Sequence, residues 1–426
     1  MIDRINGPSI KPIGKAKFPK YTKQSLDNGI ELFLVPGGTQ DMFKLEFVCF
    51  AGRRHESKPG VARLCSSLIK EGSPDKNSAQ LSEHWDYYGA LVNSYSDLDS
   101  AGLSLTGLNK HSTKLVKTWC SLLESPSFES SELDHRKKNF ADKLGRELSK
   151  NEVIAYRNLT EHIYGVDHFY GYNTLPEDYL RVDRADILDH YHRFWGTNKS
   201  FAVLAGKITP ELKEEVISAL SQIGKKSEEQ PNDAMLDPKE YRKPGQFKYT
   251  SENKLQAAIK LAHTTLSRED EDYPAFYFLI EVFGGYFGSR LMKNLREEKG
   301  LCYNIYASIE RLKLSNYLYI SAEVDGTQID QALSQIKAEI ERLQNELIGP
   351  DEMEMVRNYI KGVLLAGLDG PFRSAQMIKS YLSNELHFAY FSAFIDEIEQ
   401  VSAKKLMKMA QKYLDWSQMT IVIVGP

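Results

Sequence analysis

The sequence has few cysteines and no long hydrophobic run. Its four cysteines are widely spaced and form no C-x-x-C pair, which argues against a disulfide framework or a thiolate zinc site. Apolar runs such as TIVIVG near the end are too short to span a bilayer. The N-terminal stretch also lacks the hydrophobic segment of a secretory signal. We therefore expect reduced thiols and a cytoplasmic location, with no membrane contact.

An excess of positive charge is also lacking. The net charge is −4 over 426 residues, which provides no electrostatic surface for nucleic acid or an anionic membrane. The glycine-rich stretch FGGYFGSR contains no G-K-[ST] and does not match G-x-G-x-x-G, so it does not indicate nucleotide binding. With 42% hydrophobic and 26% charged residues, the composition is that of a globular protein with room for two or three domains.

An internal repeat is present across the two halves of the chain. HRFWGTNKSFAVLAGKITP and QKYLDWSQMTIVIVGP each place a helical segment, a polar turn and an apolar strand in that order, ending at Gly206 and Gly425. Two copies of one α+β unit are therefore expected. The polar, proline-containing stretch 224–246 is typical of a linker, so we predict domains at 1–223 and 247–426.

The sequence pattern of each half predicts strands and clustered helices. IELFLVP (30–36) and FKLEFVCFAG (43–52) have strand-like apolar content, and the second half shows similar runs in LCYNIYASIE and NYLYISAEV. Long helical stretches lie between these runs in both halves. The order predicts an α+β fold of two homologous domains, each a mostly antiparallel sheet with helices packed on one face.

One helical stretch, 60–73, carries a triad at metal-ligand spacing. Arg63, Ser66 and Ser67 stand at i, i+3 and i+4, where His, Glu and His would form the zinc motif H-x-x-E-H. A serine hydroxyl is not a normal zinc ligand, and arginine cannot deprotonate. A guanidinium about 4 Å from a dication would be repelled by roughly 8 kcal/mol at an effective dielectric near 20. These positions should be metal-free.

The same region resembles a known family. KPGVARLCSSLIKEGS, followed by YYGALVNSYSDLDS, resembles the metal-site region of the pitrilysin/insulinase metallopeptidases, which include the mitochondrial processing peptidases. Several positions match the family pattern: Gly60, Ala62, Gly72, Gly89 and Asn93. The ligand positions do not match, because Arg63 and Ser67 replace the histidines and Ser66 replaces the glutamate. The third ligand, a glutamate in the family, aligns with Arg136.

The resemblance in the second half keeps the family residues. FGGYFGSRLMKNLREEKGLCYNIYAS is similar to the family stretch S-R-L-x-x-x-I-R-E-x-x-G-L-x-Y, and it contributes Arg296 and Tyr303. In active members these two residues reach the zinc site of the opposing half. The resemblance implies that the tyrosine donates to the oxyanion, while the arginine holds a substrate carbonyl or supports that donor. Gly300 should turn the chain so that the two side chains converge.

The resemblance extends from about residue 20 to the end, and it implies a clam-shell half that works as a subunit. On this interpretation the chain is the non-catalytic, substrate-binding subunit of a heterodimeric zinc endopeptidase acting on unfolded peptides. Zinc would be held by a homologous partner with H-x-x-E-H, and a homodimer would form in the partner's absence. Two alternatives stay open: a purely structural or assembly subunit, and a self-sufficient peptidase with an unusual metal site.

Other residues have weaker functional interpretations. The strand around Asn93 and Ser94 could pair with an extended peptide, although the lack of a metal beside it favours a structural turn or strand role for Asn93. Without the family motif, Arg296 would be a last-turn cation and Tyr303 an ordinary strand residue. The ten histidines offer no second metal site. Pairs such as His168 with His162, or His190 with His192, lack a carboxylate at ligand spacing, and we expect them on the surface.

Overall fold

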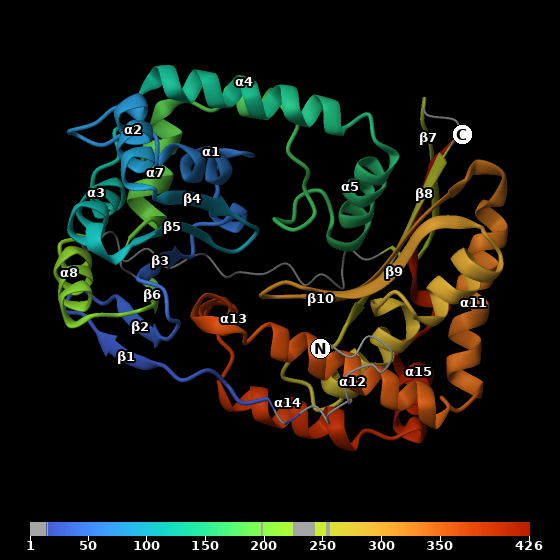
Figure 1. Ribbon diagram of the computed structural model, residues 1–426. Helices are drawn as coiled ribbons and strands as arrows, with labels where there is room; N and C mark the ends of the chain where they lie inside the picture. The colour runs from blue at the N-terminus through green and yellow to red at the C-terminus, as the bar shows by residue number, and fades with distance from the viewer. Residues whose placement is uncertain (1–13, 15, 197–198, 225–242, 253–255) are drawn as a thin grey trace, which may run out of the picture.

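The computed structural model describes residues 14, 16–196, 199–224, 243–252 and 256–426. Two halves, each a sheet with helices, face each other across a central space (Figure 1). The α+β prediction is confirmed. Most of the predicted linker, residues 225–242, lies outside the described residues, so the domain bounds stay predictions.

The first sheet has six strands in the order β1-β2-β6-β3-β5-β4. Only the β2–β6 pair is parallel, and the other neighbours are antiparallel. The strand bounds are β1 (Thr22–Ser25), β2 (Glu31–Pro36), β3 (Met42–Cys49), β4 (Leu91–Ser96), β5 (Ala101–Leu108) and β6 (Phe201–Gly206). β4 is an edge strand of this sheet.

The second sheet repeats this topology without an equivalent of β1. Its order is β7-β11-β8-β10-β9, again with one parallel pair, β7–β11. The strand bounds are β7 (Gly245–Thr250), β8 (Gln256–Thr265), β9 (Cys302–Arg311), β10 (Asn316–Asp325) and β11 (Thr420–Gly425). β9 therefore corresponds to β4, and each is the edge strand of its sheet.

The glycines that revealed the repeat have a packing reason. A Cβ on Gly206 would lie 2.4 Å from the Met42 carbonyl oxygen, and Gly206 has φ +118°. A Cβ on Gly425 would lie 2.8 Å from the Cβ of Ala257. Both glycines end the strand that forms the parallel pair, and each packs against the start of the neighbouring antiparallel strand. A side chain would therefore collide with the neighbouring strand at both sites, with its backbone at Gly206 and with the Ala257 methyl group at Gly425.

The helices fill the intervals between strands. In the first half they are α1 (Val61–Leu68), α2 (Ser78–Tyr88), α3 (Ser112–Glu124), α4 (Ser130–Glu147), α5 (Asn151–Tyr164), α6 (Pro176–Arg181), α7 (Arg184–Phe194) and α8 (Pro210–Ser221). In the second half they are α10 (Tyr273–Ile280), the π-helical turns η3 (Glu281–Gly285) and η4 (Met292–Glu298), α11 (Ile329–Asn345), α12 (Pro350–Ala366), α13 (Gly370–Ser383), α14 (Ala389–Gln400) and α15 (Ala403–Tyr413).

Two helices cross between the halves, which the sequence patterns did not reveal. Leu159 and Ile163 of α5 pack on the second sheet, against alternate residues of β8 such as Ala258. In return, Ile378 of α13 packs on the first sheet, against β2 and β6 residues such as Val203. Figure 1 shows both helices lying against the sheet of the other half. Each sheet is therefore apolar on both faces, and the halves share cores.

The expectation of surface histidines is wrong for two of them. His168 and His190 are buried, with exposed fractions of 2% and 1%. The Tyr164 ring stacks on His168, and the His190 Nε2 lies 3.1 Å from the Ala51 carbonyl oxygen. Burial lowers the pKa of each imidazole to about 4, so both are neutral at pH 7. Spacing alone missed them because tertiary packing supplies their partners.

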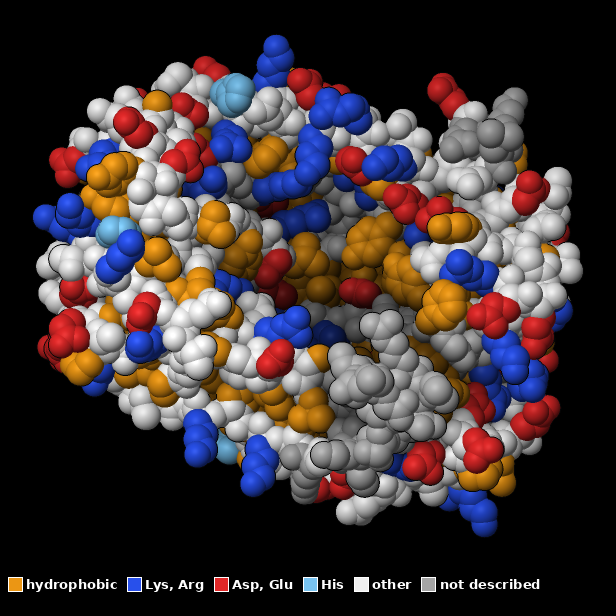
Figure 2. All heavy atoms as spheres, in the orientation of Figure 1, with side chains coloured by type: hydrophobic (Ala, Val, Ile, Leu, Met, Phe, Trp, Pro, Cys, Tyr) orange, Lys and Arg blue, Asp and Glu red, His pale blue; other side chains and the backbone are white. Residues whose placement is uncertain are grey.

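No helix in the described part of the chain combines the length and apolar character needed to cross a membrane. Between the two halves the surface is hollowed, and hydrophobic side chains line much of this hollow, with acidic and basic side chains among them (Figure 2).

Candidate functional site

Arg296 and Tyr303 lie against each other. The Arg296 guanidinium carbon is 5.4 Å from the centre of the Tyr303 ring. Gly300, at φ +61°, makes the turn between η4 and β9 that brings the two together. The expected proximity is therefore present. A second ring, Phe287, lies 5.2 Å from the same guanidinium carbon; it precedes Ser289 in the glycine-rich stretch and was not singled out from the sequence.

Tyr303 sits on a β-bulge. Cys302 pairs with Val324 and Asn304 with Glu323, so Tyr303 has no residue opposite it on β10. Its side chain is 81% exposed on an edge strand, an unusual position for a large aromatic residue. A bulge re-aims a side chain and is common beside active sites. The hydroxyl is thus free to meet a group outside the described chain.

The neighbouring cysteine does not offer a nucleophile. Burial raises the pKa of the Cys302 thiol to about 11, although Arg296 opposes the shift. The thiol therefore stays protonated at neutral pH and is a poor nucleophile.

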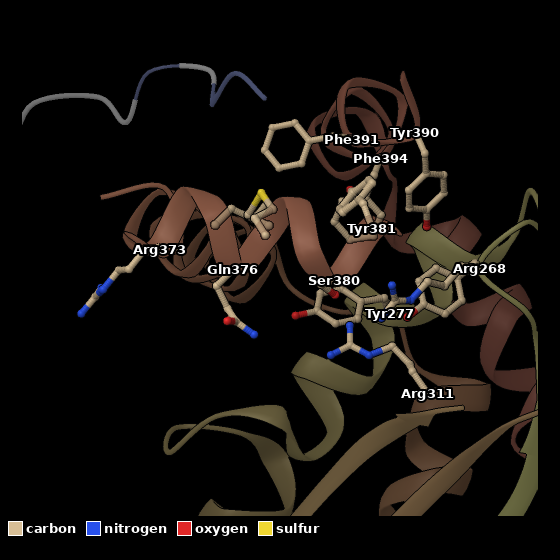
Figure 3. A pocket seen from close by; sticks show the side chains of 14 residues that line it. Arg268, Tyr277, Arg311, Arg373, Gln376, Ser380, Tyr381, Tyr390, Phe391 and Phe394 are labelled. Carbon is tan, nitrogen blue, oxygen red and sulfur yellow. The ribbon is translucent and has the colours of Figure 1, made fainter. Parts of the chain in front are cut away.

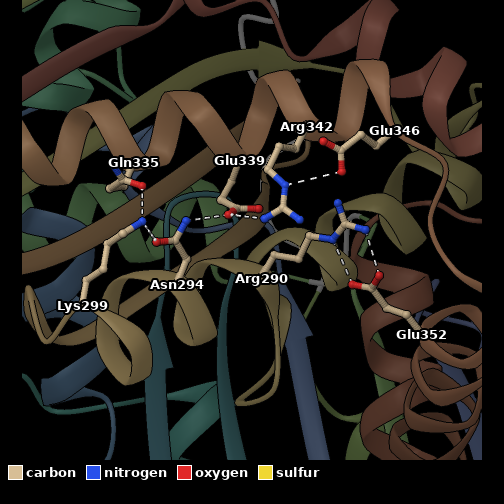
Figure 4. A network of polar contacts seen from close by, with 8 residues as sticks. All are labelled: Arg290, Asn294, Lys299, Gln335, Glu339, Arg342, Glu346 and Glu352. Atoms are coloured by element: carbon tan, nitrogen blue, oxygen red, sulfur yellow. Dashed lines mark hydrogen bonds and ion pairs between the residues drawn. The ribbon is translucent and has the colours of Figure 1, made fainter.

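A buried polar network holds η4 in place (Figure 4). Asn294, in η4, donates its side-chain NH₂ to Glu339 of α11 at 2.5 Å, and it accepts from Lys299 at 2.6 Å. Glu339 is 1% exposed and also accepts from Arg342 at 3.0 Å. Nearby, Arg290 makes a bidentate pair with Glu352 at 3.0 and 2.8 Å. Because Arg296 is two residues from Asn294, this network fixes the segment that carries it.

The helix with metal-motif spacing, α1, uses its three residues for structural contacts. Ser66 is buried and donates to the Tyr95 carbonyl oxygen of β4 at 2.7 Å. Ser67 donates to the Leu64 carbonyl oxygen of its own helix at 2.8 Å. Arg63 donates to the Tyr179 hydroxyl at 3.3 Å. This donor set does not fit a zinc ion, because it contains no imidazole, carboxylate or thiolate.

The position aligned with the third ligand, Arg136, does not complete a metal site either. Its guanidinium pairs with Glu71, just beyond the end of α1. One turn later on α4, the Phe140 ring lies 4.9 Å from the Arg63 guanidinium carbon. Among the described residues, no group of three or more His, Cys, Asp and Glu side chains could hold a metal ion.

Asn93 and Ser94 occupy the edge strand β4. Asn93 is exposed, and Ser94 is half-buried. On the sheet side, Ser104 of β5 donates to the Asn93 carbonyl oxygen at 3.3 Å. The outer edge of β4 has no neighbouring strand in the described chain, so it has the geometry for adding an extended peptide.

The structure brings Arg296 and Tyr303 together but keeps them apart from α1. Figure 1 places α1 and β9 on opposite sides of the central space. No interaction recorded for the described residues joins Arg63, Ser66 or Ser67 to the Arg296–Tyr303 pair. In this chain, therefore, α1 has the spacing of a zinc motif but no metal ligands. The exposed Arg296–Tyr303 pair lies away from α1.

Two similar sheet-and-helix halves, with a helix that has zinc-motif spacing but no zinc ligands, define a peptidase-like chain. Comparison with known proteins identifies its family. The model described as "Insulinase (Peptidase family M16)" matches residues 40–169, and "Peptidase M16 inactive domain" matches residues 181–360. The chain belongs to the M16, or insulinase, family of peptidases. This confirms the resemblance seen in the sequence.

Relatives in this family carry contrasting descriptions. The chain is 23% identical over 355 residues to "Uncharacterized zinc protease YmxG" of Bacillus subtilis, covering 82% of this chain and 84% of that protein. It is 19% identical over 387 residues to "Non-peptidase homolog YmxG" of Helicobacter pylori, covering 86% and 84%. A crystal structure of a peptidase M16 inactive domain from Pseudomonas fluorescens matches with TM-score 0.85 at 20% identity, covering 95% and 98%. Relatives thus include proteins described as inactive, and the structural likeness shows the fold.

Proposed function

We propose that this chain is the non-catalytic, substrate-binding subunit of a zinc endopeptidase that cleaves unfolded peptides. A homologous subunit with H-x-x-E-H holds the zinc, and the two subunits form a heterodimer; without that partner the chain pairs with itself. Arg296 and Tyr303 complete the partner's active site. The observation that carries this proposal is the Tyr303 hydroxyl on an exposed bulge beside the Arg296 guanidinium.

The chemistry follows from the two groups. In a tetrahedral intermediate the former carbonyl oxygen carries negative charge, and Tyr303 donates a hydrogen bond to it. Arg296 contributes positive charge beside that donor and holds a substrate carbonyl. The edge of β4, including Asn93 and Ser94, pairs with the extended substrate. No step in this scheme uses a metal ion bound to α1.

The test is Tyr303→Phe in the reconstituted heterodimer. Losing one oxyanion donor costs about 3–4 kcal/mol, so turnover of an unfolded peptide should fall about 10²–10³-fold with dimerisation intact. Tyr306→Phe is the matched control, because Tyr306 is on the same strand and 39% exposed but outside the bulge. Sedimentation verifies assembly of both variants.

Two results would decide against the proposal. Unchanged turnover in the Tyr303→Phe heterodimer would favour a structural or assembly subunit. Stoichiometric zinc in the purified chain alone, with peptide cleavage, would favour a self-sufficient peptidase.

A further inference from the structure

A cavity of 450 Å³ lies in the second half, away from both α1 and the Arg296–Tyr303 pair. Its walls come from α10, α13, α14 and the end of β9 (Figure 3). Its volume is within the range of about 300–1,000 Å³ that is typical of small-molecule sites. Most of its lining is aromatic or aliphatic, including Leu364, Met377, Tyr381, Phe391 and Phe394.

Two arginines point into this apolar cavity. Arg268 follows β8, Arg311 ends β9, and Figure 3 shows both directed to the same region near Ser380. Neither forms an ion pair with a carboxylate within 4.0 Å among the described residues. Burial lowers the pKa of the Arg268 guanidinium. The nearby positive charge of Arg311 lowers it further, because two neighbouring cations repel each other. Arg311 is open to solvent, so a ligand can reach it.

Two hydroxyls beside the cations lack an acceptor. Tyr273 is 2% exposed, and Arg268 and Arg311 interact with its hydroxyl oxygen. Because a guanidinium can only donate, the Tyr273 hydroxyl proton has no acceptor within the described structure. The buried Tyr390 hydroxyl has no hydrogen-bond partner there either. A buried donor without an acceptor is destabilising by about 1–3 kcal/mol, which makes a ligand that supplies the acceptor favourable.

Two carboxyl groups, Glu281 and Glu310, act electrostatically on Arg311, but neither forms an ion pair with it in the described chain. Glu281 lies beside Tyr277, and burial raises the pKa of its carboxyl group, while the Tyr277 hydroxyl and Arg311 oppose the shift. The Glu281 Oε2 has no hydrogen-bond partner in the described chain. The cavity therefore retains positive charge and spare donors within apolar walls.

From these features we infer that the cavity binds a carboxylate attached to an apolar or aromatic group. The planar guanidinium forks of Arg268 and Arg311 match the two oxygens of a carboxylate. Tyr273 and Tyr390 donate to the same oxygens, and the apolar part packs on Met377 and Phe394. A fully hydrated anion such as phosphate would leave those walls without a partner. The carboxylate can belong to a free acid or to the last residue of a peptide.

Calorimetry on the isolated chain tests this inference separately from the proposed function, because it needs neither a partner subunit nor proteolysis. The probes are N-acetylphenylalanine, its amide, and inorganic phosphate. The free acid should bind, and the amide should bind about tenfold or more weakly, since a charge-assisted hydrogen bond is lost. Equal binding of the acid and the amide would overturn the inference. So would no binding of the acid, or phosphate binding as tightly as the acid.

Variants locate the site. Arg268→Gln and Arg311→Gln should each weaken acid binding about tenfold or more. Arg373→Gln is the matched control, because Arg373 lines the same cavity but donates to the Ala366 carbonyl oxygen at 2.8 Å. It should bind the acid as the wild type does. Unchanged affinity in both Arg268→Gln and Arg311→Gln, with the acid still preferred over the amide, would place the site elsewhere and overturn the assignment.

Two further probes identify the source of the carboxylate. A free acid, 4-phenylbutyrate, is compared with a peptide that ends in phenylalanine, and that peptide with its amidated form. Binding of both acids shows that the apolar carboxylate suffices. Binding of the peptide acid alone, lost on amidation, identifies a peptide carboxyl terminus. Failure of all carboxylates to bind rejects the site.

Discussion

Replacing Glu339 by glutamine should loosen the segment that carries Arg296. The Glu339 carboxylate is buried and accepts the Asn294 side-chain NH₂ at 2.5 Å (Figure 4). Its second partner, Arg342, has a side chain that is 53% exposed, so solvent screens that pair and we count only the Asn294 bond. The glutamine carbonyl oxygen can still accept this bond, so the substitution removes only its charge assistance: a bond to a charged group is worth about 1.5–3 kcal/mol and a neutral one about 1 kcal/mol. A loss of about 1 kcal/mol should make local opening of η4 about fivefold more frequent.

Hydrogen exchange measured by mass spectrometry gives the readout. Peptides covering η4 should exchange about fivefold faster in Glu339→Gln than in the wild type. Glu341→Gln is the control, because Glu341 is on the same helix but its side chain is 57% exposed. Its ion pair with Lys337 is long, at 3.8 Å, and screened by solvent. This control should leave η4 unchanged. Equal exchange in the two variants, or an unchanged η4 in Glu339→Gln, would refute the role assigned to this network.

Two further predictions concern the shared cores and the buried histidines. Leu159→Ala should destabilise the chain by about 2–5 kcal/mol and shift fluorescence and circular-dichroism unfolding curves together, because α5 joins the halves; a shift in only one probe would contradict this. His190 has a pKa of about 4 when folded and about 6.5 when unfolded, so it contributes stability above pH 6.5 that is lost as the pH falls toward 4. The difference in unfolding free energy between the wild type and His190→Gln should shrink by about 3 kcal/mol across that window, whereas a constant difference would contradict it.

Local patterns predicted much of the fold and part of the candidate site. The repeat was visible because β6 and β11 both end in glycine, where a side chain would collide with the neighbouring strand. The proximity of Arg296 and Tyr303 was predictable because a single glycine turn joins their segments.

Other features needed long-range contacts that leave no local pattern. The Asn294–Glu339 bond joins residues 45 positions apart, and neither position has a periodic signal. The bulge at Tyr303 depends on the register of β9 against β10, which the composition of either strand does not specify.

The sequence by itself determined that α1 cannot bind zinc through the positions of the zinc motif. Arg63, Ser66 and Ser67 cannot make a zinc ligand set in any fold, because ligand chemistry belongs to the side chains themselves. Tertiary structure decided where the halves meet. Helix α5 covers the sheet of the other half, and Arg268 and Arg311 converge in one cavity. These arrangements depend on burying apolar surface between distant segments, and the same helical periodicity is compatible with either sheet as the partner.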